Sequence, residues 1–100
     1  MRQHVLVLTV SSSQIITSNS ATLAGMQLGT DGVNDPTVTI YDGTTNAGNE
    51  IVPTTTYDAS ALGLSGFVGA YDKKAYNGIY VEISGAGSVE VTVDYRETNA

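Results

Sequence analysis

The 100-residue chain has no cysteine and no tryptophan, a single histidine, and only four lysine and arginine residues. Without cysteine, neither a disulfide framework nor a thiolate metal site can form. The net charge of −6 argues against nucleic acid or an anionic membrane as a partner, because both bind cationic protein surfaces. No apolar run approaches the ~18–20 residues that span a bilayer. The length leaves room for one folded domain, which we expect to cover residues 1–100.

Residues suited to catalysis are equally scarce. His4 is the only histidine, so a Ser-His-Asp or Cys-His arrangement within the chain would depend on this residue near the N-terminus. We interpret it as an ordinary residue at the start of a strand. Glu82 and Glu90 would form a carboxylate pair only if they faced each other across a hairpin. Both are expected on a polar, exposed sheet face, so we predict that the protein is not an enzyme and has no catalytic residue.

The clearest positive feature is a strict alternation of apolar and polar residues near the C-terminus, on both sides of the Gly-Ala-Gly at 85–87. Such an alternation is typical of strands with one buried and one solvated face. We therefore predict a β-hairpin over residues 77–96. Its buried face would carry Ile79, Val81, Ile83, Val89, Val91, Val93 and Tyr95.

Five further strands are predicted from runs of apolar and β-branched residues between turn residues. They cover residues 5–10, 14–17, 21–29, 37–41 and 50–56. The fourth and fifth of these are expected to pair as another hairpin. Gly25 is expected to form a β-bulge, and Pro53 indicates an edge strand or a bulge, because proline has no N–H to donate.

The segment from Tyr57 to Tyr76 has no steady period, because several glycines interrupt its apolar residues. We predict a long loop that crosses one end of the fold, with one turn of helix at 59–62 and a short strand near Phe67. With seven or eight short strands and no crossover helices, the chain is predicted to be all-β. The expected architecture is a small antiparallel β-sandwich or jelly roll.

Two loops carry oxygen ligands of the kind that calcium prefers. In residues 42–50 the order of ligands required by a calcium-binding loop is broken at Thr44 and Ala47, and a turn between strands explains these residues better. Asp31 and Asp35 are a second, similar candidate. No cofactor or metal is predicted at either. Four of the six tyrosines are candidates for a cluster that serves subunit contact or carbohydrate binding; they are Tyr57, Tyr71, Tyr76 and Tyr80.

Two segments resemble a known group of proteins. Residues 78–96 read Gly-Ile-Tyr-Val-Glu-Ile-Ser-Gly-Ala-Gly-Ser-Val-Glu-Val-Thr-Val-Asp-Tyr-Arg, a pattern that resembles small virion proteins of tailed bacteriophages. Residues 38–51, Val-Thr-Ile-Tyr-Asp-Gly-Thr-Thr-Asn-Ala-Gly-Asn-Glu-Ile, are similar to the strand-turn-strand that precedes it in those proteins. The resemblance covers about a third of the chain. It implies a β-sandwich structural protein of the capsid decoration, or cement, type.

On this resemblance we expect a non-enzymatic protein of the outer capsid surface, a homo-oligomer and in particular a homotrimer. Its partners would be its own copies and the major capsid protein or other virion proteins, without nucleic acid or membrane. The alternative is a neck, tail or fibre component that contacts the host surface or glycans. Subunit contacts are expected from the N-terminal strand, which can add to a neighbour, and from the apolar, irregular segment before the last hairpin. The candidate interface residues are Val5, Val7, Leu62, Leu64, Phe67, Val68 and Tyr71.

Overall fold

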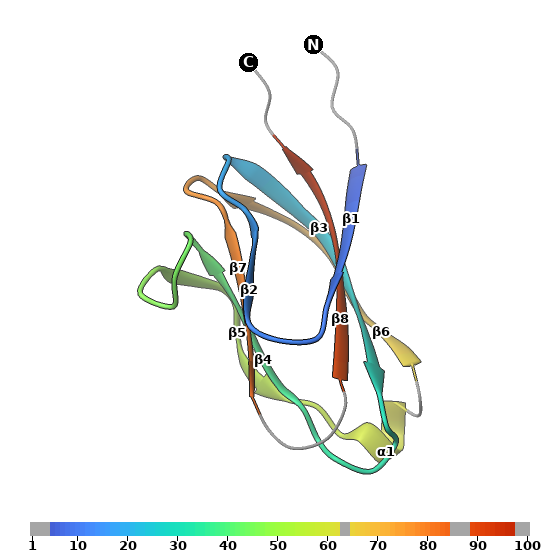
Figure 1. Ribbon diagram of the computed structural model, residues 1–100. Coiled ribbons are helices and arrows are strands. Elements are labelled where there is room, and N and C mark those ends of the chain that lie inside the picture. Colours follow the sequence, from blue (N-terminus) through green and yellow to red (C-terminus); the bar gives the residue numbers. More distant parts are fainter. Residues whose placement is uncertain (1–4, 63–64, 85–88, 98–100) are drawn as a thin grey trace.

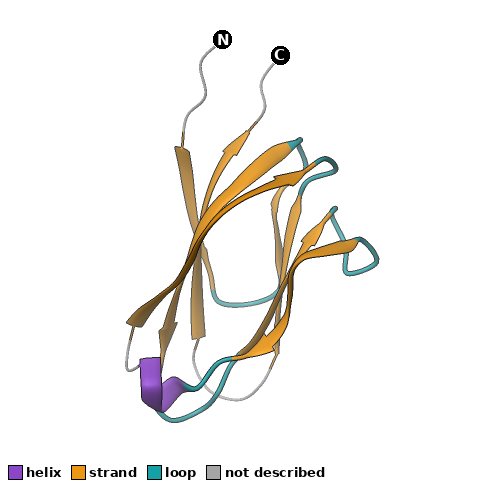
Figure 2. Ribbon diagram, turned by 180° about the vertical axis from the view of Figure 1, so that it is seen from behind, coloured by secondary structure: helices purple, strands orange, loops and turns teal. Residues whose placement is uncertain are grey.

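The computed structural model describes residues 5–62, 65–84 and 89–97, which form two antiparallel sheets of four strands each (Figure 1). The two sheets face each other, and a short helix lies at one end of the sandwich (Figure 2). In chain order the elements are β1 (Val5–Val10), β2 (Gln14–Thr17), β3 (Ala21–Thr30), β4 (Thr37–Asp42), β5 (Asn49–Thr56), α1 (Ala59–Leu62), β6 (Ser65–Ala75), β7 (Ile79–Ser84) and β8 (Val89–Glu97).

The strand order confirms the predicted all-β sandwich and selects the jelly roll. Sheet A has the order β1-β8-β3-β6, and sheet B has the order β2-β7-β4-β5. Counted from the two ends of the chain inward, β1 lies beside β8, β2 beside β7, β3 beside β6 and β4 beside β5. Successive pairs belong to sheets A, B, A and B. This nested arrangement is that of a jelly roll, a double-sheet solution in which each half of the chain contributes to both layers.

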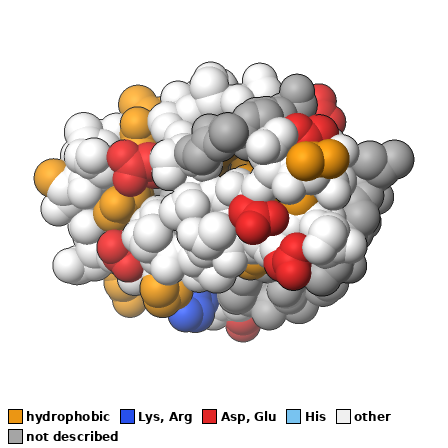
Figure 3. Space-filling view, turned by 90° about the horizontal axis from the view of Figure 1, so that it is seen from below, with side chains coloured by type: hydrophobic (Ala, Val, Ile, Leu, Met, Phe, Trp, Pro, Cys, Tyr) orange, Lys and Arg blue, Asp and Glu red, His pale blue; other side chains and the backbone are white. Residues whose placement is uncertain are grey.

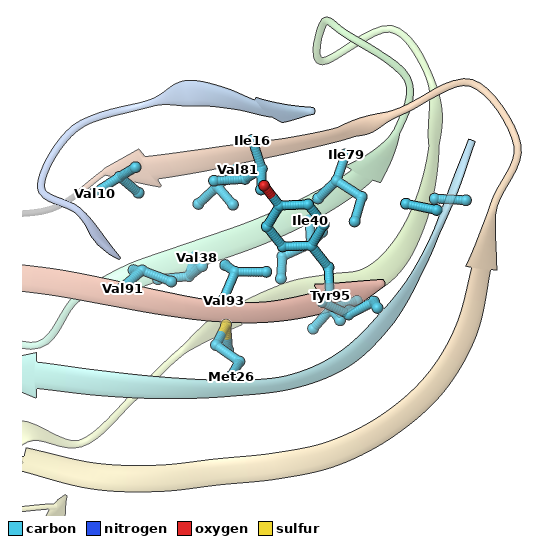
Figure 4. Packing of buried hydrophobic residues seen from close by; sticks show 14 of the residues in the cluster. Val10, Ile16, Met26, Val38, Ile40, Ile79, Val81, Val91, Val93 and Tyr95 are labelled. Atoms are coloured by element: carbon cyan, nitrogen blue, oxygen red, sulfur yellow. The ribbon is translucent and has the colours of Figure 1, made fainter. Parts of the chain in front are cut away.

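The core lies between the two sheets and is built by the alternating residues of their inner faces (Figure 4). From sheet B, Ile40 and Val81 are fully buried, and from sheet A, Met26 and Val93 are fully buried opposite them. The predicted inner face of β7 and β8 is confirmed. Its buried residues are Ile79, Val81, Val91, Val93 and Tyr95, and its partly buried residues, packed against the core, are Ile83 and Val89. Each buried aliphatic side chain contributes about 1.5–3 kcal/mol relative to an exposed one.

The predicted C-terminal hairpin is wrong, although both of its strands exist. β7 pairs with β2 and β4 in sheet B, whereas β8 pairs with β1 and β3 in sheet A. Between residues 84 and 89 the chain thus passes from one sheet to the other. The alternation of apolar and polar residues determines which face of each strand is buried. It does not determine whether the two strands pair in one sheet or lie in two facing sheets, because both arrangements bury the same faces. Glu82 and Glu90 consequently belong to different sheets and do not form a carboxylate pair.

The predicted strand near Phe67 is present but far longer than expected, because residues 65–75 form β6, the longest strand, where most of the segment was predicted to be a loop. β6 pairs with β3, and the register shifts twice along this pair, between Leu23 and Gly25 and between Met26 and Gln27. Each shift breaks the alternation of faces, so the sequence of β6 lacks the period-two pattern of a regular strand. The predicted bulge at Gly25 is confirmed by the pairing of β3 with β8, where the step from Leu23 to Gly25 spans one residue more than the step from Tyr95 to Asp94.

The remaining local predictions are mostly confirmed. β4 and β5 form the second hairpin, and Pro53 lies in β5, an edge strand whose register shifts nearby. The turn of helix at 59–62 is present as α1. Its first N–H groups are satisfied by acidic side chains: Asp35 accepts a hydrogen bond from the Ala59 amide at 3.0 Å, and Asp58 accepts one from the Ser60 amide at 3.0 Å.

The C-terminal end of β8 is tied to the facing sheet. Glu97 is the last residue of β8. Its carboxylate accepts hydrogen bonds from the Thr17 hydroxyl of β2 and from the Asn19 side-chain amide. The Thr17 hydroxyl in turn accepts a hydrogen bond from the Asn19 backbone N–H at 3.1 Å. These polar contacts connect the two sheets at the end opposite α1.

Candidate functional site

The predicted interface residues lie in three places. Val5 and Val7 are in β1, at one edge of sheet A, and β6 forms the opposite edge of the same sheet. Within β6 lie Phe67, Val68 and Tyr71, while Leu62 ends α1. Leu64 lies outside the described residues, as do the side chains of the other six. Within one subunit, the fold thus separates the two halves of the predicted interface by the width of a sheet.

The four edge strands differ in how they are protected against further strand pairing. β2 has only four residues and a register shift, and β5 carries Pro53, a glutamate and two shifts. β6 carries charged residues at 72–74. β1 reads Val-Leu-Val-Leu-Thr-Val, without charge or proline, and pairs with β8 through six consecutive residues without a shift. Charges, prolines and bulges normally keep edges from pairing, so β1 is the least protected edge.

The outer face of sheet B carries a row of side chains that crosses all four strands. Ile15 of β2 pairs with Tyr80 of β7, Tyr80 pairs with Tyr41 of β4, and Tyr41 pairs with Glu50 of β5. The rings of Tyr41 and Tyr80 have centroids 6.3 Å apart and planes tilted by 45°. Ile15 is 45% exposed. We call this row, together with Glu82 and Asn46, the tyrosine face.

Hydrogen bonds organise the tyrosine face around Glu82. Its carboxylate accepts a hydrogen bond from the Tyr41 hydroxyl at 3.1 Å and another from the Asn46 side-chain amide at 3.2 Å. Tyr41 is only 8% exposed although it points away from the core. Burial, and secondly the hydrogen bond to Glu82, raise the pKa of the Tyr41 hydroxyl. The hydroxyl therefore stays protonated and remains a donor to Glu82 at neutral pH.

Next to this network, hydroxyl groups pair across β4 and β5. Thr39 and Thr54 lie 2.7 Å apart through their hydroxyl oxygens, and so do Thr37 and Thr56. Glu50 accepts a hydrogen bond from the Thr54 backbone N–H at 3.3 Å. The outer face of sheet B thus presents hydroxyl, carboxylate and amide groups whose positions are set by one another.

Sequence reasoning found only part of this face. A strand was predicted over residues 37–41, and with Val38 and Ile40 buried in the core its alternation leaves Tyr41 on the outer face. It gave no sign that Tyr41 would meet Tyr80, because that contact depends on the pairing of β4 with β7. The predicted cluster of four tyrosines is not formed by the described side chains. Tyr57 packs against the core next to α1, whereas Tyr76 follows β6 at the opposite end.

The loop carboxylates considered for calcium have structural roles. One Asp31 oxygen accepts hydrogen bonds from two backbone N–H groups of its own turn, at 2.9 and 2.8 Å. Asp35 accepts a hydrogen bond at the start of α1, and Asp42 accepts one from the Asn77 backbone N–H at 2.8 Å. Among the described residues, no group of three or more histidine, aspartate or glutamate side chains is placed to hold a metal ion. Seen from the α1 end, acidic groups are scattered over a mostly uncharged surface (Figure 3).

His4 lies outside the described residues. In the described ranges, no helix has the length and hydropathy needed to cross a membrane. In comparisons with known proteins, no family model matches the chain, and no curated protein matches it.

Proposed function

We propose that this chain is a non-enzymatic structural protein of a tailed-phage virion, a capsid decoration protein that binds as a homotrimer to the outer shell. The observation that carries the proposal is the unprotected β1 edge. An apolar edge strand of this kind pairs readily with another strand. In a protein that functions when assembled, this property becomes the means of binding, because main-chain hydrogen bonds supply affinity when a strand is added.

The position of β6 supports a cyclic oligomer. The first seven residues of β6, Ser65–Tyr71, carry no charge and lie at the edge of sheet A opposite β1. A contact between β1 of one copy and this part of β6 of the next copy is heterologous, so it closes into a ring when the rotation permits. Such a ring would join the two halves of the predicted interface, one from each neighbour.

The proposed task is mechanical. A decoration protein stabilises the shell because it binds the assembled state and not the dissociated subunits. Weak contacts repeated over many sites suffice, since their effects combine through avidity. The low proportion of charged residues, 14% of the chain, suits a protein packed against neighbours.

The oligomer is tested by placing a lysine in each edge. Val7→Lys puts an ammonium group in β1 at the position paired with Asp94 and charges the edge. Phe67→Lys does the same in β6, and Gln27→Lys adds the same charge to a central strand of sheet A as a control. Sedimentation velocity should show trimers for wild type and Gln27→Lys, and monomers for each edge variant. Circular dichroism and thermal melting are used to check that each variant is folded. Tyr71→Lys is a second variant of the β6 edge, to be used if Phe67→Lys does not fold.

Mixing the edge variants identifies the contact. Val7→Lys retains an intact β6 edge and Phe67→Lys retains an intact β1 edge, so an equimolar mixture should form dimers with one copy of each. Dimers of Phe67→Lys alone would instead indicate a contact of β1 with β1. A wild-type chain that sediments as a monomer and does not bind expanded capsids of its own phage would contradict the proposed function.

A neck, tail or fibre component that contacts glycans on the host is the second candidate. The tyrosine face favours it, since aromatic rings beside carboxylate and amide groups are suited to sugars. Cosedimentation with purified heads and with purified tails distinguishes the two placements.

A further inference from the structure

The polar side chains on the outer face of sheet B are held in place by hydrogen bonds to one another, unlike those of an ordinary solvated sheet surface. On such surfaces polar side chains normally contact water and are free to move. Here Glu82 is held by two donors from different segments, Tyr41 and Asn46. Thr39, although it is on the outer face, is 2% exposed. The polar groups are thus held in place before any ligand arrives, which lowers the entropy lost on binding.

We propose that the tyrosine face is a binding site for an uncharged glycan. Tyr80 is partly exposed and Ile15 beside it is exposed, so these two residues provide a surface for the apolar C–H face of a sugar ring. Each carboxylate oxygen of Glu82 accepts one hydrogen bond within the protein. Each has a second lone pair, which can accept a hydrogen bond from a sugar hydroxyl. Asn46, which is exposed, and Glu50 extend the same set of polar groups.

The charge of the face selects an uncharged ligand. Glu50 and Glu82 repel sulfated or sialylated glycans. The described cationic side chains are engaged elsewhere: the Lys73 ammonium donates to the Ile51 carbonyl at 3.0 Å, Lys74 lies 5.7 Å from the Tyr76 ring centre, and Arg96 pairs with Asp72 at 3.1 Å. The hydroxyl groups of a neutral sugar can donate hydrogen bonds to these carboxylates, and a neutral sugar carries no negative charge that the carboxylates would repel.

A protein partner fits this face less well. The cores of protein interfaces are rich in apolar and aromatic side chains and poor in charge. Among the described residues, the large hydrophobic side chains that are exposed are Ile15, Val33 and Tyr76, and of these Ile15 alone belongs to the tyrosine face. The face also lies on a different sheet from β1 and β6. A glycan can therefore bind while both edges of sheet A are occupied, so this proposal does not depend on the proposed assembly.

The test is a titration followed by ¹H–¹⁵N NMR, with the wild-type chain and a panel of neutral gluco-, galacto- and mannooligosaccharides. Sialylated and sulfated oligosaccharides serve as charged counterparts. At least one neutral sugar should shift the amide signals of β4, β5 and β7 near the tyrosine face. Glu82→Gln should weaken that binding by about ten-fold or more, the effect expected for a lost hydrogen bond to a charged group. Tyr80→Ala should also weaken it, because the sugar ring loses its aromatic contact surface.

The matched control is Glu90→Gln, an identical change at an exposed residue of sheet A. It should leave the affinity unchanged. Glu50→Gln provides an independent variant if Glu82→Gln disturbs the sheet, as judged from the dispersion of the spectrum. The proposal is overturned if no neutral sugar binds, if charged glycans bind more tightly, or if Tyr80→Ala and Glu50→Gln bind as well as wild type. A shift of oligomeric state in Tyr80→Ala without any glycan binding would assign the face to a protein partner instead.

Discussion

Replacing a glycine by alanine can destabilise a protein in two ways, by backbone strain and by overlap of the new Cβ with neighbouring atoms. Three glycines near the tyrosine face, Gly43, Gly48 and Gly78, allow the two effects to be measured separately. Gly43 and Gly78 have φ angles of +146° and +114°, which residues with a side chain rarely adopt. A Cβ at Gly43 would meet no atom closer than 3.8 Å, whereas a Cβ at Gly78 would lie 2.6 Å from the Thr17 carbonyl oxygen. At Gly48 the φ angle is ordinary, but a Cβ would overlap the Asp42 carbonyl oxygen. Alanine therefore introduces backbone strain at Gly43, overlap at Gly48 and both at Gly78.

The magnitudes follow from these geometries. Backbone strain in a rarely populated region costs about 1–3 kcal/mol, so Gly43→Ala should lower the free energy of unfolding by this amount. Forcing an extra methyl group into packed structure costs about 1–3 kcal/mol more. Gly78→Ala combines both costs and should therefore lower the free energy of unfolding by about 2–6 kcal/mol, against the 5–15 kcal/mol that is typical of a domain. The backbone at Gly78 cannot move freely, because its carbonyl accepts a hydrogen bond from the Gly43 N–H at 3.0 Å.

Urea unfolding followed by far-ultraviolet circular dichroism measures these differences. The expected order of stability is wild type, then Gly43→Ala, then Gly78→Ala, with unchanged m-values. Each kcal/mol should lower the melting temperature by about 4–8 °C in a chain of this size. If Gly78→Ala is as stable as Gly43→Ala, the close approach of Gly78 to β2 is refuted. If Gly48→Ala is as stable as wild type, the tight turn between β4 and β5 is refuted.

Two further predictions concern pH and the core. Burial raises the pKa of both Tyr41 and Tyr95 above the unfolded value of 10.0, so their contribution to stability is present below pH 10 and is lost as the pH rises through the raised pKa values. The tyrosinate absorbance of these two side chains should therefore rise only above pH 10. The urea concentration at the midpoint of unfolding should fall less at alkaline pH in Tyr41→Phe than in wild type, and an equal fall in both would contradict the raised pKa of Tyr41. Ile40→Ala, in the core, should cost about 2–5 kcal/mol, but Ile15→Ala, on the outer face, should cost under about 0.5 kcal/mol. Similar melting temperatures for the two variants would contradict the assigned faces.

The local structure of most strands was predictable because it depends on neighbours in the chain. The alternation in residues 79–84 and 89–95 requires one dry and one wet face, and the structure buries Val81 and Val93 accordingly. Pro53 indicated an edge strand or a bulge because it has no N–H to donate. The same local rules failed for β6, since its bulges against β3 shift the faces of successive residues. A pattern of period two is visible only where the register is continuous.

Which strands pair was decided by the tertiary structure alone. The sequence of β7 and β8 is compatible with a hairpin, yet the two strands lie in different sheets, because burying both apolar faces requires two layers that cover each other. The tyrosine face has the same origin. Its row of Ile15, Tyr80, Tyr41 and Glu50 combines four strands through their register, and no spacing along the chain relates these residues. Composition and alternation therefore specify an all-β chain and the inner faces of most strands, and the pairing of strands from distant parts of the chain creates its sheet edges and outer surfaces.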